Sequence, residues 1–518
     1  MRRRDFIAAS GAVTVDLAAA QPSRARSGWH SGPVGHILPA ASHDRLQIKV
    51  SLKATPPQPP TLAVGGAGRR LSRIVGKPTS SDGRYWRFDI QNLSADRPYR
   101  LQIHSPGGGQ TDPWTVRTLP SPGSSPRSFR LLTYTCAGGD EATVTAGRRA
   151  FNPIHVRRAL LERALSFRPD AVIANGDHIY WDQETAFNKP AGAAIRDYYR
   201  KTSGLFDLDL AAVSQANAKV LSRVGDAQIA DLYGVAFRST PMWFVRDDHD
   251  YFDNDQVIDG VPTFPPTAFR RALTDQLQAM FWPDLLGTGP PVSYGTGSFG
   301  SLRWGRLFEA LLYDCRGYLS LVDGGFVPAG VEQWIAQRTG DPDVTHVMQT
   351  PSTPWGWTAG KWGEWYPDVT GMDGRLTTKI PKAGWRPGWF EQHQRLLAVA
   401  GSRGKPSLVM SGDLHAVGLG RLDQSGEVKP ESPVYVVLSG PIGTDDLSFP
   451  SAARAQAPTH PAGVAVSDLL TPREKNGFTI VDATTDGLRV RQFIWRAPDP
   501  VEVIATLKPA LDIFIPTG

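Results

Sequence analysis

Residues 171–182 read AVIANGDHIYWD, an apolar run that ends abruptly in the ionisable residues Asp177, His178 and Tyr180. The run has the length of a buried strand of a parallel sheet, and the Gly-Asp pair that follows it is typical of a turn. Open α/β sheets place their functional residues just beyond the carboxyl ends of such strands. The stretch therefore predicts a layered α/β domain with Asp177 at an edge of its sheet.

Three other apolar runs end in ionisable residues in the same way. They are residues 129–135, which end at Cys136, residues 242–245, which lead into RDDHDYFDND, and residues 408–410, which lead into SGDLH. Because the carboxyl ends of parallel strands meet at one edge, we expect the four segments to converge. Carboxylate, imidazole, phenol and thiol groups each bind a cation when anionic or carrying a free lone pair, so convergence predicts a metal site.

Each residue alone has a less specific explanation. A Gly-Asp after a strand is commonly a turn or a helix cap, and His415 could be a core histidine. Asp247, Asp248 and Asp250 could form a solvated acidic loop. Together, however, these three carboxylates lie around His249 directly after an apolar strand, where they repel one another unless a cation neutralises them. The block therefore favours a bound metal ion.

The chain before this domain follows another pattern. Between residues 40 and 120, short runs alternate apolar and polar residues, and proline- and glycine-rich segments separate them. This pattern predicts a small β-sandwich, similar to a fibronectin type III-like domain. A Ser/Pro/Gly-rich linker at 119–128 precedes the α/β domain, which we expect to occupy residues 127–518 and to end in a hairpin at 478–495.

Residues 1–20 resemble a twin-arginine signal peptide. Arg2, Arg3 and Arg4 precede a weakly apolar stretch that ends in the small residues Ala18 and Ala20, although Asp16 interrupts it. We expect export to the periplasm or the extracellular space by the twin-arginine translocation machinery. The alternative is a frayed basic terminus.

The composition excludes several classes of protein. A chain of 518 residues with 41% hydrophobic and 20% charged residues is not globally disordered and has room for two to four domains. It has no run of 18 apolar residues, so no membrane span is predicted, and its two cysteines cannot form a disulfide scaffold. The net charge of +6 is spread along the chain, so charge does not indicate nucleic-acid binding. The oligomeric state is left open.

The four segments, in their order and together with YDCR at 313–316, resemble the calcineurin-type metallophosphoesterase superfamily, in its branch of PhoD-like alkaline phosphatases and phosphodiesterases. The β-sandwich and the export signal also fit that branch, so the resemblance covers nearly the whole chain. It implies a four-layer α/β/β/α domain after the sandwich. It also implies a metal-dependent hydrolase of phosphate monoesters and diesters, active at alkaline pH.

The resemblance implies two kinds of metal. A ferric ion would be held by Cys136, Asp177, Tyr180 and His415. Asp177 would bridge to one or two calcium ions, with Asp248 or Asn254 and Asp413 as further ligands. Thiolate and phenolate suit Fe(III), whereas oxygen ligands suit Ca²⁺.

This chain departs from the superfamily at the second metal. The superfamily commonly has Asn at the position of Asp248 and His at that of Asp413. Where it has a further histidine, this chain offers only Gln349 or Thr350, so the ligands of the second metal stay open.

The expected reaction needs no protein nucleophile. Two cations about 3.5 to 4 Å apart would clamp the phosphate oxygens and activate a hydroxide for in-line attack on phosphorus, with Asp177 as the central catalytic ligand. His249 would protonate the leaving oxygen or hold a phosphate oxygen, the alternative being a supporting hydrogen bond. Arg316 would bind phosphate or pair with Asp314. Ser-hydrolase and P-loop motifs are absent from the sequence.

Three alternatives concern other features. Six of the 15 tryptophans lie between residues 346 and 389, either as a pocket wall or as anchors of a long loop. Cys315 is the one cysteine that could pair with Cys136, and we expect both to stay free thiols. The natural ester could be a phospholipid or a cell-wall polymer, and a decayed, non-catalytic binding protein is the rival from another class.

Overall fold

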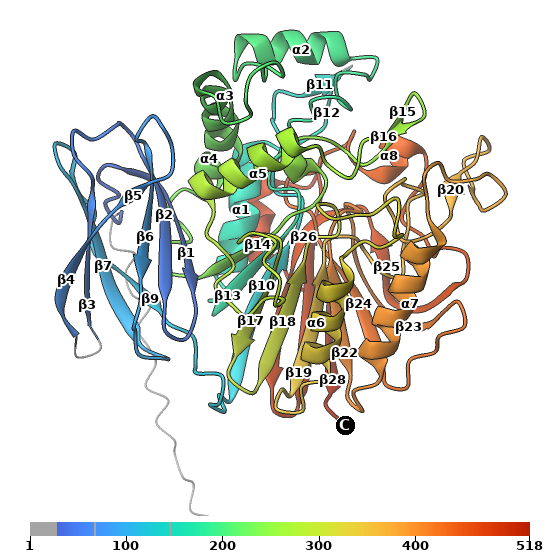
Figure 1. Ribbon diagram of the computed structural model, residues 1–518. Helices are drawn as coiled ribbons and strands as arrows, with labels where there is room; N and C mark the ends of the chain where they lie inside the picture. Colours follow the sequence, from blue (N-terminus) through green and yellow to red (C-terminus); the bar gives the residue numbers. More distant parts are fainter. Residues whose placement is uncertain (1–27, 67–68, 146) are drawn as a thin grey trace, which may run out of the picture.

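A computed structural model describes residues 28–66, 69–145 and 147–518, as Figure 1 shows. The predicted signal peptide at 1–20 lies outside the described residues and stays a prediction. No helix in the described part of the chain is long and apolar enough to cross a membrane.

The first unit is the predicted β-sandwich, drawn in blue in Figure 1. One sheet has the order β1 (Val34–Ala41), β2 (Leu46–Leu52), β6 (Tyr85–Ile90) and β5 (Lys77–Pro78). The other has β4 (Arg69–Val75), β3 (Thr61–Gly66), β7 (Pro98–Ser105) and β8 (Gly109–Gln110), with β9 (Trp114–Arg117) also on β7. Buried and exposed residues alternate along β7, as a two-sheet core requires. The sandwich begins at Val34 rather than at residue 40.

The first sheet of the α/β domain carries three of the four predicted strands. Its order is β14 (Met242–Val245), β13 (Ala171–Asn175), β10 (Ser128–Tyr134), β26 (Asn476–Thr484), β27 (Gly487–Trp495) and β28 (Leu511–Pro516). Strands β10, β13 and β14 are parallel, whereas β26, β27 and β28 are antiparallel and include the predicted hairpin. Parallel pairing brings the ends of β10, β13 and β14 to one edge.

The second sheet carries the fourth predicted strand, β22. Its order is β17 (Phe299–Trp304), β18 (Phe308–Tyr313), β19 (His346–Pro351), β22 (Ser407–Ser411), β24 (Val434–Ser439), β23 (Val417–Ser425) and β25 (Val464–Arg473). Strands β18, β19, β22 and β24 are parallel. Short pairs complete the strands: β11 (Val144–Thr145) with β12 (Arg148–Arg149), β15 (Val257–Ile258) with β16 (Val261–Pro262), and β20 (Val369–Thr370) with β21 (Leu376–Thr377).

The two sheets pack face to face, and helices cover their outer faces. Leu131 and Ile173 of the first sheet share a core with Leu312 and Met410 of the second. The next residue of β10, Leu132, faces the opposite way, toward the helices, because side chains alternate along a strand. Helices α1 (Ile154–Leu165), α3 (Gln215–Gly225), α4 (Asp231–Tyr233) and α5 (Ala268–Phe281) cover the first sheet, and α6 (Ala329–Thr339) and α7 (Pro387–Gly401) cover the second. The four-layer α/β/β/α prediction is confirmed.

The remaining helical segments are short or lie above the sheet edge. They are α2 (Gly192–Lys201), α8 (Pro450–Arg454), a π-helical turn at Asp226–Ala230, and 3₁₀ turns at His249–Tyr251 and Val501–Thr506. In Figure 1, α2 and α8 lie at the same end of the molecule, beyond the ends of β13 and β14.

Candidate metal centre

The ends of the four predicted strands meet at one place. The side chain of Asn175, the last residue of β13, donates hydrogen bonds of 3.1 Å to the carbonyl oxygens of Pro351 and Met410 in the second sheet. The approach is close, because a Cβ at Gly412 would lie 2.2 Å from Oγ1 of Thr135. Sheet-to-sheet packing therefore brings residues remote in sequence to a common centre.

Backbone strain is concentrated at this centre. Cys136, Asp177, Asp413 and His415 have φ values of 48°, 58°, 63° and 46°. Left-handed backbone is unfavourable for these residues, and such strain persists mainly where the surrounding structure enforces a functional geometry. All four are predicted metal ligands.

The four predicted ligands of the first metal lie in contact. The Asp177 carboxylate Oδ2 is 3.3 Å from the Cys136 thiol, 2.8 Å from the Tyr180 hydroxyl and 4.0 Å from Nε2 of His415. The Tyr180 hydroxyl is 3.0 Å from that same nitrogen. The other oxygen of Asp177, Oδ1, is buried without a hydrogen-bond partner. An unpaired buried carboxylate oxygen amid a thiol, a phenol and an imidazole fits a cation.

Burial sets the protonation of these groups. It raises the pKa of Cys136, of Asp177, where the Asp248 carboxylate adds to the effect, and of Tyr180. Burial lowers the pKa of His415 to about 3, so its ring is neutral. Nδ1 of His415 lies 2.6 Å from the Ser448 carbonyl oxygen and donates to it, which leaves the lone pair of Nε2 facing the centre. A metal ion therefore fits these four residues, by displacing their protons.

The acidic half of the centre contains two cationic side chains: Arg316, which was predicted as a site residue, and Lys361, which was not. The ammonium of Lys361 lies 2.6 Å from Oδ2 of Asp248 and 2.6 Å from Oδ1 of Asp413. The guanidinium of Arg316 lies 2.9 Å from Oδ2 of Asp413. Although burial alone raises the pKa of Asp248 and Asp413, these neighbouring positive charges lower both overall. Both oxygens of Asp413 are therefore in ion pairs.

The expected calcium ligands do not fit as a complete set. Oδ1 of Asp248 and Oδ1 of Asn254 are buried without a hydrogen-bond partner, but Asp413 has no free oxygen. Gln349 does not face the centre, because its side chain bonds Tyr313 and Thr339. Ligand atoms of Asp177, Asp247, Asp248 and Asp413 lie within 4.8 Å of one another, and Oδ2 of Asp247 is also unpartnered. Even so, the free side-chain oxygens are fewer than the six to eight oxygens that calcium takes.

The prediction that Arg316 contacts phosphate is wrong for this structure, and so is its alternative. The guanidinium is fully buried and also lies 2.7 Å from Asp247 and 2.6 Å from Asp255, so no face is free for an ester. Asp314 instead accepts a hydrogen bond from the backbone N–H of Arg316. The sequence did not reveal this because Asp247 and Asp255, which follow β14, and Asp413, which follows β22, surround the guanidinium only in the fold.

His249 lies over Tyr180 and is held by the carboxylate of Asp182, which was not predicted as a site residue. Its Nδ1 is 2.6 Å from Oδ1 of Asp182, and its ring centroid is 4.1 Å from that of Tyr180. Burial alone lowers the pKa of His249, but Asp182, Asp248 and Asp177 outweigh it and raise the pKa to about 10. Because Nδ1 of His249 is held by the Asp182 carboxylate, Nε2 is the ring nitrogen left to act as a proton donor. The sequence did indicate Asp182, because it is an ionisable residue in the same segment after the apolar run as Asp177 and Tyr180.

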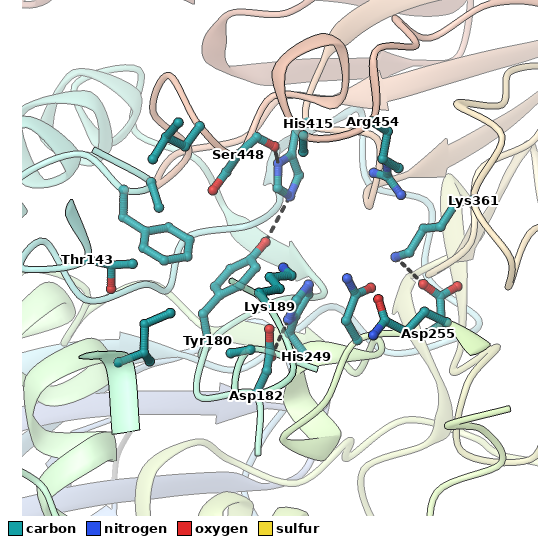
Figure 2. Close-up of a pocket in the computed structure, with 18 of the residues that line it drawn as sticks. Thr143, Tyr180, Asp182, Lys189, His249, Asp255, Lys361, His415, Ser448 and Arg454 are labelled. Carbon is teal, nitrogen blue, oxygen red and sulfur yellow. Dashed lines mark hydrogen bonds and ion pairs between the residues drawn. The ribbon is translucent and has the colours of Figure 1, made fainter. Parts of the chain in front are cut away.

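A cavity of about 450 Å³ opens over the centre, and Figure 2 shows the residues that line it. Tyr180 and His415 lie on one side of it, and Lys361 lies on the other. Lys189 and Arg454 also line the cavity, and Nε of Arg454 is buried without a hydrogen-bond partner. Apolar residues complete the wall: Phe151, Ala186, Ile195, Trp362 and Leu447. The cavity suits an anion that carries an organic group.

Most tryptophans of the segment 346–389 are buried in the domain and hold this long loop against it, rather than forming a pocket wall. Trp355, Trp357, Trp365 and Trp389 are fully buried, whereas Trp362 lines the cavity. Both cysteines are free, as expected.

Comparisons with known proteins support the fold. The structure of PhoD superposes with a TM-score of 0.61 and 14% identity, over 90% of this chain and 87% of that chain. The purple acid phosphatase PPD1 from yellow lupin (Lupinus luteus) seeds superposes with a TM-score of 0.54 and 12% identity, over 90% of this chain and 72% of that one. No family model matches the chain, nor does any curated protein. At these identities the likeness establishes a shared fold.

Proposed function

We propose that this protein is an exported, metal-dependent phosphoric ester hydrolase of the PhoD-like type, with phosphodiesterase and phosphomonoesterase activity. The observation that carries the proposal is the contact of Cys136, Asp177, Tyr180 and His415 on the floor of a cation-lined cavity. Its fold is shared with PhoD and a purple acid phosphatase. The arginine-rich sequence of residues 1–20 supports the export part.

Cys136, Asp177, Tyr180 and His415 would hold the metal ion, and their thiolate and phenolate character suits iron. Such an ion supplies a Lewis acid that polarises the phosphoryl group and lowers the pKa of water.

The protein's own residues supply binding and proton transfer. Arg454 and Lys189, on the wall of the cavity, attract the phosphate anion, and the apolar wall accepts its organic group. His249 donates the proton of Nε2 to the leaving oxygen, since Asp182 fixes Nδ1 and so holds the ring in place.

The test is hydrolysis of bis-p-nitrophenyl phosphate and p-nitrophenyl phosphate by the purified protein, with its metal content measured on the same sample. We expect turnover of both esters and loss of turnover in Asp177→Asn. A folded protein that binds metal yet hydrolyses neither ester, nor phospholipid or cell-wall polymer, would favour the non-catalytic rival.

A further inference from the structure

The acidic half of the metal centre already contains a positively charged side chain of the protein, Lys361. The ammonium of Lys361 lies within 2.7 Å of carboxylate oxygens of Asp248, Asp255 and Asp413. Lys361 is only 5% exposed, so these contacts are shielded from water. Asp248 and Asp413 are also the two carboxylates that were predicted to bind the second metal ion. A metal ion there would have to share them with the Lys361 ammonium.

Arg316 is a second cation that pairs with the same group of carboxylates. Its guanidinium pairs with Asp247, Asp255 and Asp413, so Lys361 and Arg316 together contact all four carboxylates of this cluster: Asp247, Asp248, Asp255 and Asp413. Unpaired charges of this kind are costly to bury, and the two fixed cations offset much of that cost. A divalent metal ion would do the same in their absence.

The position of Lys361 is held by its loop. The carboxylate of Glu364 accepts hydrogen bonds from the backbone N–H groups of Lys361, at 3.0 Å, and of Ala359, at 2.9 Å. Glu364 is fully buried, so the loop is built around it. These hydrogen bonds therefore fix the backbone of Lys361, so that its ammonium group is preorganised in the centre.

Few ligand oxygens are therefore left for calcium at this cluster. At the carboxylate cluster and Asn254, the unpartnered side-chain oxygens outside the ion pairs are Oδ1 of Asp177, Asp248 and Asn254 and Oδ2 of Asp247. These four are fewer than the six to eight oxygens that calcium takes. A divalent ion bound there would also lie beside the ammonium that shares Asp248, and the two positive charges would repel each other. We propose that Lys361 takes the place of the second metal ion, so that each chain holds one metal ion, at Cys136, Asp177, Tyr180 and His415. This inference rests on the proposed function, because it concerns the same centre.

The first test is the metal content of the wild-type chain. The protein is purified in the presence of calcium chloride, dialysed, and analysed for all metals, and calcium binding is measured by calorimetry. We expect one transition-metal ion per chain, no retained calcium, no calorimetric signal, and an unfolding midpoint that added calcium leaves unchanged. A second tightly bound ion in the wild-type chain overturns the proposal.

The second test removes the ammonium. In Lys361→Ala the carboxylates lose their cation and gain a void, so this variant should bind one additional divalent ion per chain. Added calcium or manganese should then raise its unfolding midpoint by several degrees, because the ion binds only the folded state. A folded Lys361→Ala that gains no ion also overturns the proposal.

A matched control comes from the same segment. Lys382 is likewise buried, but its ammonium donates to the carbonyl oxygens of Glu364 and Tyr366 rather than to the carboxylate cluster. Lys382→Ala should therefore gain no divalent ion. If Lys361→Ala does not fold, the metal content of the wild-type chain decides the proposal alone.

The measurements on the wild-type chain distinguish an error about Lys361 from an error about the proposed function. If the centre is not a metal site at all, the wild-type chain holds no transition metal and hydrolyses no ester. If only the role of Lys361 is wrong, the wild-type chain is active and holds two ions.

Discussion

The phenol oxygen of Tyr180 lies 3.0 Å from Nε2 of His415, although 235 positions separate the two residues in the chain. The same phenol oxygen lies 2.8 Å from the Asp177 carboxylate. One hydroxyl proton cannot serve both acceptors, and Oδ1 of Asp177 has no partner at all. A metal ion satisfies the whole set at once, which is why this contact is the clearest sign of a metal centre.

Cys136→Ala should lose most of the bound metal, because the thiolate is a ligand that no neighbouring side chain can replace. Elemental analysis of the purified variant provides the measurement. Cys315→Ala is the matched control: Cys315 is equally buried, but its thiol belongs to none of the groups of possible metal ligands found among the described residues. Metal retained in Cys136→Ala at the wild-type level would contradict the assignment.

Asp177→Asn should lower kcat by roughly 10³-fold or more, since the amide removes a central anionic ligand. Steady-state hydrolysis of bis-p-nitrophenyl phosphate measures this. Circular dichroism and the unfolding midpoint should confirm that the variant is folded, so that lost activity is not lost structure. A variant that keeps even a tenth of the wild-type kcat would argue against a central role for Asp177.

His249→Gln should slow hydrolysis in a way that depends on the leaving group. An alkoxide needs a proton as it departs, so alkyl esters should lose about 10² to 10⁴-fold in kcat, whereas p-nitrophenyl esters should lose much less. Asp182→Asn should show the same dependence with a smaller loss, because it acts through the orientation of His249. Equal losses for both ester types would assign His249 to phosphate binding instead.

Arg454→Met should raise KM for the phosphate ester by roughly 10- to 100-fold while leaving kcat within a few-fold, because a charge-assisted hydrogen bond contributes roughly 1.5 to 3 kcal/mol. The control is Arg421→Met, whose side chain is 50% exposed and paired with Asp423 outside the cavity. If KM is unchanged in Arg454→Met, the anion contacts another part of the wall.

The stability of the protein should fall with acidification, in part through His36 at the contact between the sandwich and α5. Burial lowers the pKa of His36 from its ordinary 6.5 to about 4, and its Nε2 lies 2.9 Å from the carbonyl oxygen of Phe281. The unfolded chain therefore takes up this proton first. The contribution is complete above pH 6.5, is lost as the pH falls toward 4, and amounts to roughly 3 kcal/mol.

Urea unfolding across this pH range measures the effect. His36→Gln keeps an N–H donor and cannot titrate, so its free energy of unfolding should depend less steeply on pH than that of the wild-type chain. His43→Gln, at a side chain that is 45% exposed, controls for the exchange of histidine for glutamine itself. A slope in His36→Gln equal to the wild-type slope would remove His36 from this role.

Much of the fold could be predicted because its signals are local. The strand of residues 242–245 was predicted to the residue, since four apolar residues between polar segments form a buried strand. Cys136, Asp177 and His415 were predicted as site residues because each follows such a strand. The start of the sandwich at Val34 was missed because the strand β1 is buried at nearly every position and shows no alternation.

The amino-acid sequence by itself determined a β-sandwich followed by a layered α/β domain, and the donor groups that the strand ends present, because hydrophobic periodicity and residue type act over a few neighbouring positions. Only the tertiary structure decided which charges pair. Lys361 meets Asp248 and Asp413 across 113 and 52 positions, and Arg316 turns away from the cavity into three carboxylates. Ion pairing depends on distance and burial, and both arise only when the two sheets pack.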